Sequence, residues 1–230
     1  MIYEVIRLEN GRYIFLTDHL NRLFNNLKKY NLTEIYDSII EALERFKKNH
    51  ENVSVRILIN IENKSFELDV LKIIETSIDE KVQGVKVGLY EFKRNRPEIK
   101  IYHKEMKEEV NSILKKVGLF ELLLISDGYI TEGSRSNIFY MLDGKLFTPP
   151  SYDVLPGIVK KNFIQMLKQK GITFSERQLS CDEIDKIDGI LLTGTGMDVT
   201  NVMCVEKINY NNSFLKKLVI DFQEYKKITA

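Results

Sequence analysis

The stretch Ser126–Phe139, SDGYITEGSRSNIF, lies between two apolar runs and decides how the rest of the chain is interpreted. The run LLLI precedes it and NIFYML continues from Asn137, so it is expected to join two buried strands. Asp127-Gly128 is typical of a tight turn between such strands. A turn does not account for Glu132, a carboxylate where the neighbouring pattern predicts burial. Taken alone, a glutamate at a strand end is usually solvated surface, so its role has to be decided from the rest of the chain.

The composition is that of a globular protein, with 230 residues, 43% of them hydrophobic and 29% charged. The net charge of +1, from 34 basic and 33 acidic side chains, gives no electrostatic reason to expect nucleic acid or an anionic membrane as a partner. No apolar run approaches the roughly 18 residues of a membrane span, and the first residues lack a signal-peptide pattern. Cys181 and Cys204 form no CxxC pair, and the histidines show no metal-ligand spacing. We expect a cytoplasmic protein with no metal.

Residue periodicity predicts an α+β protein of two domains. A basic, proline-containing segment, Lys93–Glu98, has the composition of a linker. The expected organisation is a small N-terminal α+β domain at residues 1–92, a linker at 93–99 and a larger C-terminal domain at 100–230. In the first part, strands are predicted at 3–7, 13–16, 53–59, 65–70 and 85–90, and helices at 18–30 and 33–48. In the second part, helices are predicted at 104–116, 157–170 and 213–225, with a buried strand at 190–193 and a short helix opened by a capping box at 180–183.

Three further segments have the chemistry to bind a ligand. The segment Leu155–Val159 contains a Pro-Gly turn before a predicted helix, whose first N–H groups would suit a phosphate. The segment Thr193–Gly196 follows a buried strand, and its glycines and hydroxyls would also suit phosphate oxygens. Arg22 lies on a predicted helix whose other face is apolar. Each of them, taken singly, is also explained by an ordinary helix start, a loop or a surface arginine.

The order of the motifs is more specific than any one of them. HLNRLF, an IK after the basic segment, DGYITEGSRSNIF, LFTPP, VLPGI and LLTGTG follow one another along the chain. This series resembles the class IV (fold type IV) pyridoxal-phosphate enzymes, which include branched-chain aminotransferases, D-amino-acid aminotransferases and 4-amino-4-deoxychorismate lyases. The resemblance extends from YEVIR to VTNV. It implies the two-domain α+β fold of that family, N-terminally shortened, and a homodimer whose active sites lie between the domains and near the subunit boundary.

The resemblance also implies roles for two candidate catalytic residues. Lys100, 21 residues before Glu121, matches the lysine that forms a Schiff base with pyridoxal 5'-phosphate and then moves protons. Lys104 is the alternative, with poorer spacing. Glu132 matches the glutamate that faces the pyridine nitrogen, where an opposite charge keeps the ring protonated. This role would explain a carboxylate between two strands.

The remaining matches concern the cofactor's phosphate and ring. Arg22 matches the arginine that holds the phosphate, and Leu155 matches the apolar side chain against the ring face. The rest of the phosphate cradle matches Gly157, the backbone N–H groups of Ile158 and Val159, and Thr195. Val159 replaces the family's usual threonine, so that it keeps the backbone donor and loses a hydroxyl.

Two departures bear on activity. Family members usually carry a further segment before the FE-x-IR strand, so substrate specificity cannot be carried over from that region. Glu105 stands where branched-chain aminotransferases commonly place a tyrosine, and Tyr102 and His103 are near but out of register.

Three hypotheses follow from the resemblance and its departures. The first is an aminotransferase that moves the amino group of an α-amino acid, branched-chain ones among the candidates, to a 2-oxo acid. The second is an aminodeoxychorismate lyase that releases pyruvate and 4-aminobenzoate, which the absent tyrosine favours slightly. The third is a homologue without turnover.

Overall fold

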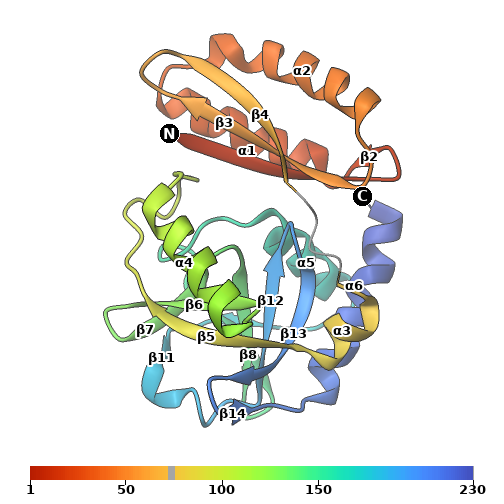
Figure 1. Cartoon of the computed structure of the whole chain (residues 1–230). Coiled ribbons are helices and arrows are strands. Elements are labelled where there is room, and N and C mark those ends of the chain that lie inside the picture. Colours follow the sequence, from red (N-terminus) through yellow and green to blue (C-terminus); the bar gives the residue numbers. More distant parts are fainter. Residues whose placement is uncertain (72–75, 230) are drawn as a thin grey trace. The chain divides into compact units, whose positions relative to one another are not determined.

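The computed structural model describes residues 1–71 and 76–229. The chain forms two compact units (Figure 1). The first comprises residues 1–74, 99–102 and 229–230, and the second comprises residues 75–98 and 103–228. Each unit has its own sheet, so the predicted α+β class is confirmed. The role of residues 93–99 as an interdomain linker stays a prediction.

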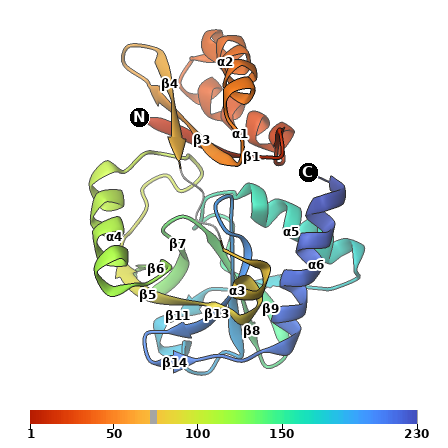
Figure 2. The same cartoon turned by 45° about the vertical axis from the view of Figure 1, so that its right-hand side comes forward.

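The sheet of the first unit has four antiparallel strands in the order β2-β1-β3-β4. Two amphipathic helices, α1 and α2, pack their apolar stripes on one face of this sheet (Figure 2). That face is lined by alternate residues of β1 and β3, as the two-residue period of a strand requires. The elements are β1 Ile2–Glu9, β2 Arg12–Tyr13, α1 Leu16–Lys29, a 3-10 turn Thr33–Ile35, α2 Tyr36–Asn49, β3 Val53–Asn60 and β4 Ser65–Leu71.

One residue breaks the apolar pattern of β1. Ile2, Ile6 and Leu8 are buried on the helix-covered face, and Glu4 takes the place between Ile2 and Ile6. Glu4 is opposite Ile57 in the pairing with β3, and none of its surface is exposed. A carboxylate in an apolar row needs a charged partner, and α1 supplies one, as described below.

The second unit is built on a ten-stranded mixed sheet in the order β10-β9-β8-β12-β13-β5-β6-β7-β11, with β14 paired to β13. Its strands are β5 Val85–Glu91, β6 Glu121–Ser126, β7 Tyr129–Gly133, β8 Asn137–Leu142, β9 Lys145–Thr148, β10 Ser175–Glu176, β11 Leu179–Ser180, β12 Gly189–Gly194, β13 Asp198–Val205 and β14 Ile208–Asn209. Its helices are α3 Ile78–Gln83, α4 Lys104–Val117, α5 Ile158–Gln169 and α6 Ser213–Thr229, with a 3-10 turn at Cys181–Glu183.

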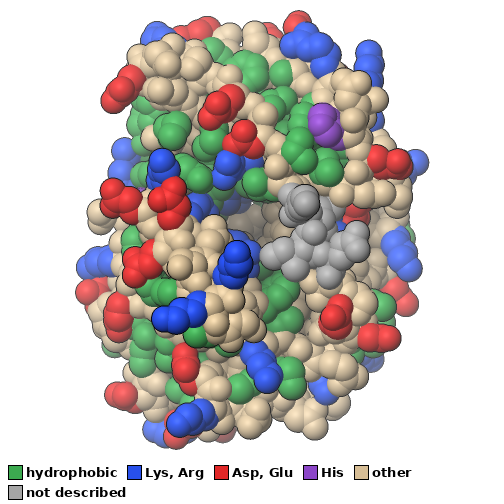
Figure 3. Space-filling view, in the orientation of Figure 1, with side chains coloured by type: hydrophobic (Ala, Val, Ile, Leu, Met, Phe, Trp, Pro, Cys, Tyr) green, Lys and Arg blue, Asp and Glu red, His purple; other side chains and the backbone are tan. Residues whose placement is uncertain are grey.

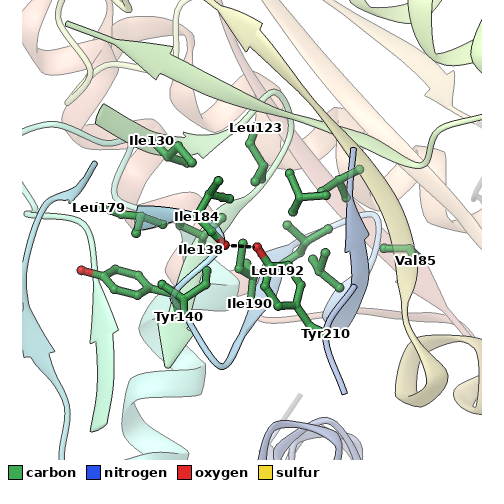
Figure 4. Close-up of a cluster of buried hydrophobic side chains, with 14 of the residues drawn as sticks. Val85, Leu123, Ile130, Ile138, Tyr140, Leu179, Ile184, Ile190, Leu192 and Tyr210 are labelled. Atoms are coloured by element: carbon green, nitrogen blue, oxygen red, sulfur yellow. Dashed lines mark hydrogen bonds between the residues drawn. The ribbon is translucent and has the colours of Figure 1, made fainter. Parts of the chain in front are cut away.

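The core of the second unit is a cluster of buried apolar side chains from several strands of this sheet (Figure 4). Side chains from β6, β7, β8 and β12 meet there, among them Leu123, Ile130, Ile138 and Leu192. Tyr210 is buried with them and satisfies its hydroxyl by donating to the carbonyl of Ile184 at 2.5 Å. The strands that flank Glu132 are therefore anchored in this core.

The structure differs from the sequence expectation in several elements. The sequence predicts the strand at 85–90 as part of the N-terminal domain. In the structure this strand, β5, pairs in parallel with β6 and β13 of the second sheet. Residues 14–16 are not a strand, because Phe15 adopts a left-handed φ of 52° and turns the chain into α1. Strand β13 was not expected. Helix α3 was missed although Ser77 and Glu80 form a capping box, the same signal that correctly predicted the turn at 180–183.

Side chains of both charges are interspersed over the face in Figure 3, as the small net charge predicts. Within residues 1–71 and 76–229, no helix has the length and apolar character to cross a membrane.

Candidate functional site

Glu132 lies near the end of β7 and is 2% exposed. Its Oε1 accepts a hydrogen bond from Arg94 Nε at 2.6 Å. Its Oε2 accepts from Asn137 Nδ2 at 3.3 Å and from the backbone N–H of Leu155 at 3.2 Å. An ionised carboxylate offers about four acceptor positions, so three donors leave room for one more. A protonated ring nitrogen supplies one N–H donor, which matches the position that is left.

A second buried carboxylate, Glu121, orders the loop that follows Glu132. Glu121 accepts from Ser134 Oγ at 2.5 Å, from Ser136 Oγ at 3.2 Å and from the backbone N–H of Arg135 at 3.2 Å. These bonds satisfy both serines of GSRS and hold the connection between β7 and β8. Glu121 therefore holds the loop that joins Glu132 on β7 to Asn137 on β8.

Asn137 ties Glu132 to the start of α5. Its Nδ2 also donates to the carbonyl of Leu155 at 2.8 Å. A Cβ added to Gly157 would lie 1.9 Å from Asn137 Oδ1, far inside van der Waals contact. Any larger residue would displace Asn137 from its hydrogen bonds, which explains the glycine of the Pro-Gly pair. The structure thus brings Glu132, Leu155 and Gly157 into one place.

The first turn of α5 has the polarity expected of an anion site. Gly157 is its N-cap residue, and the backbone N–H groups of Ile158 and Val159 follow. The turn contains no acidic residue, although acidic residues are the usual choice at a helix start, and it carries Lys160 instead. Burial lowers the pKa of Lys160, against the attraction of Glu176 and Glu132, which raises it. A phosphate would satisfy the donors and the charge of this turn.

Thr195 begins the loop between β12 and β13 and is half-buried. Gly194 before it packs closely on the loop after Glu132, because an added Cβ would lie 2.9 Å from the carbonyl oxygen of Arg135. At the far end of the loop, Asp198 accepts from Lys81 Nζ at 2.7 Å and from Lys226 Nζ at 2.9 Å. These contacts fix both ends of the Thr195 loop.

In the first unit, Arg22 is held by the buried carboxylate of Glu4. Arg22 Nε donates to Glu4 Oε2 at 2.9 Å and Arg22 Nη2 donates to Glu4 Oε1 at 2.6 Å. Nδ1 of His19 lies 3.1 Å from the same Oε1. Burial would raise the pKa of Glu4, but the Arg22 charge and the His19 hydrogen bond outweigh it and hold that pKa well below its usual range. The bidentate pair orients the guanidinium through its Nε–Nη2 edge.

Lys100 belongs to the same unit as Arg22. Its carbonyl accepts from the backbone N–H of Tyr3 at 2.9 Å, and its Nζ lies 4.6 Å from the centroid of the Tyr3 ring. The Lys100 charge also contributes to the lowered pKa of His19, whose largest cause is burial. The alternative, Lys104, is 69% exposed and pairs with Glu108 at 3.9 Å.

The residues near the absent tyrosine position make the following contacts in the described structure. Glu105 is exposed in the first turn of α4. The hydroxyl of Tyr102 accepts from Arg56 Nη1 at 3.2 Å, and His103 is the N-cap residue of α4.

Sequence reasoning missed Glu4, Arg94, Glu121 and Asn137, which hold the predicted residues in place. For Glu4 a signal existed, because it interrupts the two-residue apolar period of β1. For Arg94 none existed, because its segment has the composition of an exposed linker. The predicted roles of the site residues themselves stay predictions.

The buried Glu4–His19 contact predicts acid sensitivity. Burial lowers the pKa of His19, so the folded protein keeps it neutral where the unfolded chain, with a pKa of about 6.5, takes up a proton. Below about pH 6.5 the free energy of unfolding should therefore fall, by up to about 1.4 kcal/mol per pH unit for this proton. Urea unfolding of the wild type and His19→Gln across this range measures the effect. The His50→Gln control should keep the wild-type pH dependence, and an unchanged dependence in His19→Gln would contradict the prediction.

The sequence of the chain matches the family described as Amino-transferase class IV over residues 1–204. The chain belongs to the class IV aminotransferase family. This is a family of pyridoxal-phosphate enzymes, so the expected enzyme class is confirmed.

A Rickettsia felis protein named a probable branched-chain-amino-acid aminotransferase is 26% identical over 93% of this chain and 80% of its own length. Solved structures share the fold of this class IV protein. A Legionella pneumophila protein that carries the name 4-amino-4-deoxychorismate lyase has a TM-score of 0.80 at 20% identity, covering 97% of this chain and 90% of that one. A branched-chain amino acid aminotransferase from T.th., solved with pyridoxamine 5'-phosphate, has a TM-score of 0.80 at 17% identity, covering 100% of this chain and 86% of that one.

Proposed function

We propose that this class IV protein is a pyridoxal-phosphate-dependent aminotransferase that moves the amino group of an α-amino acid to a 2-oxo acid. The observation that carries the proposal is the Glu132 carboxylate, which is buried, held by three donors and joined through the Leu155 N–H to the start of α5. Burying a carboxylate is costly unless donors surround it, and the three donors of Glu132 leave one acceptor position that a protonated ring nitrogen would fill. Branched-chain amino acids are the first substrates to test, because the relatives carry that name.

The proposal assigns each predicted site residue a role toward the cofactor. Arg22, Gly157, Thr195 and the backbone N–H groups of Ile158 and Val159 would bind the phosphate, and Leu155 would lie against the ring. Their fit rests on the charge and donors present: a guanidinium oriented by Glu4, and a helix start without acidic residues. When bound, pyridoxal phosphate supplies an aldehyde that reacts with amines and a ring that accepts the electron pair released at the substrate Cα.

The chain's own groups would do the proton chemistry. Glu132 would hold a proton on the ring nitrogen by accepting its hydrogen bond. Lys100 Nζ would hold the cofactor covalently, and as a free amine it would move the proton at the substrate Cα. Lys100 Nζ lies over the Tyr3 ring and its charge acts on the buried His19, whereas Lys104 is exposed, and this contrast supports the choice of Lys100.

The second candidate is a 4-amino-4-deoxychorismate lyase. The exposed Glu105, where branched-chain aminotransferases carry a tyrosine, favours it, and a structural neighbour carries that name. A homodimer, implied by the resemblance, and a cytoplasmic location stay predictions; light scattering checks the first.

A substrate screen of the purified holoenzyme tests the proposal. We expect glutamate to form when amino acids are supplied with 2-oxoglutarate, with the largest rates for branched-chain substrates. Pyruvate and 4-aminobenzoate formed from aminodeoxychorismate, with no glutamate in the first assay, would establish the lyase instead. Protein that takes up no pyridoxal phosphate, and so lacks absorbance at about 410–430 nm, would contradict both enzymes and favour a homologue without turnover.

A further inference from the structure

We propose that Arg94 is a positioning residue that keeps the proton between Glu132 and the cofactor's ring nitrogen on the nitrogen. This inference rests on the proposed role of Glu132. Arg94 is not part of the motifs that indicate the family, and the proposed role would give the segment after β5 a function.

The contact between Arg94 and Glu132 is short and buried. Arg94 Nε lies 2.6 Å from Glu132 Oε1, and the two side chains are 8% and 3% exposed. The other two donors, the Asn137 amide and the Leu155 N–H, are neutral. Among the described residues, Arg94 is therefore the one cation that donates a hydrogen bond to this carboxylate.

The position of Arg94 decides the direction of its effect. A proton shared by a carboxylate and a ring nitrogen can rest on either atom. The guanidinium bonds directly to Glu132, whereas a ring nitrogen on another lone pair of the carboxylate would be farther from it. Because Coulomb energy falls with distance, Arg94 favours the carboxylate anion more than it opposes the nearby N–H cation. The ionic arrangement, with the proton on the nitrogen, is therefore stabilised, and burial limits screening by solvent.

Lys160 does not replace Arg94 in this role. Its charge is attracted by Glu132, but its Nζ lies 3.5 Å from the carbonyl oxygen of Pro149 and over the Phe139 ring at 6.0 Å. Removing Arg94 would leave Glu132 with neutral hydrogen-bond donors only, so the ionic arrangement would lose the cation that favours it.

The test compares Arg94→Met and Arg94→Lys in the holoenzyme, with Arg96→Met as the matched control. Arg96 lies in the same segment, but its side chain is 55% exposed and lies 3.5 Å from Glu98. The readouts are the 15N chemical shift of the ring nitrogen in labelled pyridoxal phosphate, kcat and KM. One opposite charge moves a titration by about one to three pH units, so Arg94→Met should lower the protonated fraction and kcat by roughly tenfold or more. KM should change less, Arg94→Lys should recover part of the loss, and Arg96→Met should match the wild type.

A Glu132→Gln variant measured in parallel separates the two proposals. If Glu132→Gln leaves the nitrogen signal unchanged, the proposed role of Glu132 fails. If Glu132→Gln shifts the signal and Arg94→Met does not, the inference about Arg94 alone fails. Loss of cofactor from Arg94→Met with a normal signal in the remaining holoenzyme would make Arg94 a structural residue and overturn the inference. In the Glu132→Gln background, adding Arg94→Met should have no further effect on the signal, because the two residues act as a unit.

Discussion

Lys100→Ala is expected to lower kcat by roughly 10²–10⁴-fold, the range that a positioned proton-transfer group contributes. The same change should abolish covalent attachment of pyridoxal phosphate, because no amine remains at this position. The support for Lys100 is local. It lies beside Tyr3, and its charge reaches the buried His19 that contacts Glu4.

Borohydride trapping followed by peptide mapping measures attachment, and steady-state kinetics measure turnover. Lys104→Ala is the comparison, because Lys104 is the other lysine that the spacing allows. Lys104 is exposed and pairs with Glu108, so its replacement should retain attachment at Lys100. Trapped pyridoxal phosphate recovered on Lys104, or full activity in Lys100→Ala, would show that Lys100 is not the lysine that binds the cofactor.

Glu4→Gln is expected to destabilise the first unit by about 3–5 kcal/mol, the cost of removing one partner of a buried ion pair. The variant would leave Arg22 buried without its anion, and the new amide N–H₂ would face the donors of Arg22. Glu4 is fully buried, and Arg22 Nη2 lies 2.6 Å from it, so solvent offers little compensation. Hydrogen exchange of the β1 and β3 amides reports on this unit directly.

Glu34→Gln is the control for this prediction. Glu34 pairs with Lys64 at 3.1 Å in the same unit, but the two side chains are 52% and 61% exposed. An exposed pair is screened by solvent and contributes little to stability, so amide protection should change little. If the β1 and β3 amides exchange equally slowly in Glu4→Gln and Glu34→Gln, the Glu4–Arg22 pair does not stabilise the fold.

Local elements were predictable because their signals lie within a few neighbouring residues. The helix expected at 104–116 is α4, Lys104–Val117, and the strands around SDGYITEGSRSNIF are β6, β7 and β8. Apolar periodicity and the Asp-Gly turn are local signals, because a helix or strand buries one face at a fixed residue spacing and a turn is specified by two neighbouring residues. The partners of β5 were not predictable, because parallel pairing joins segments far apart in the chain and leaves no local mark.

By itself, the sequence determined the family of this protein and the candidate residues Lys100, Glu132 and Arg22, because the order and spacing of motifs are properties of the chain. Tertiary structure alone decided which groups hold these candidates. Arg94 lies in a segment with the composition of a linker, yet its side chain is buried against Glu132. Glu4 lies in an apolar strand, yet it orients Arg22. The physical reason is that the cost of burying a charge depends on the atoms that surround it, and those atoms come from strands and helices that only folding brings together.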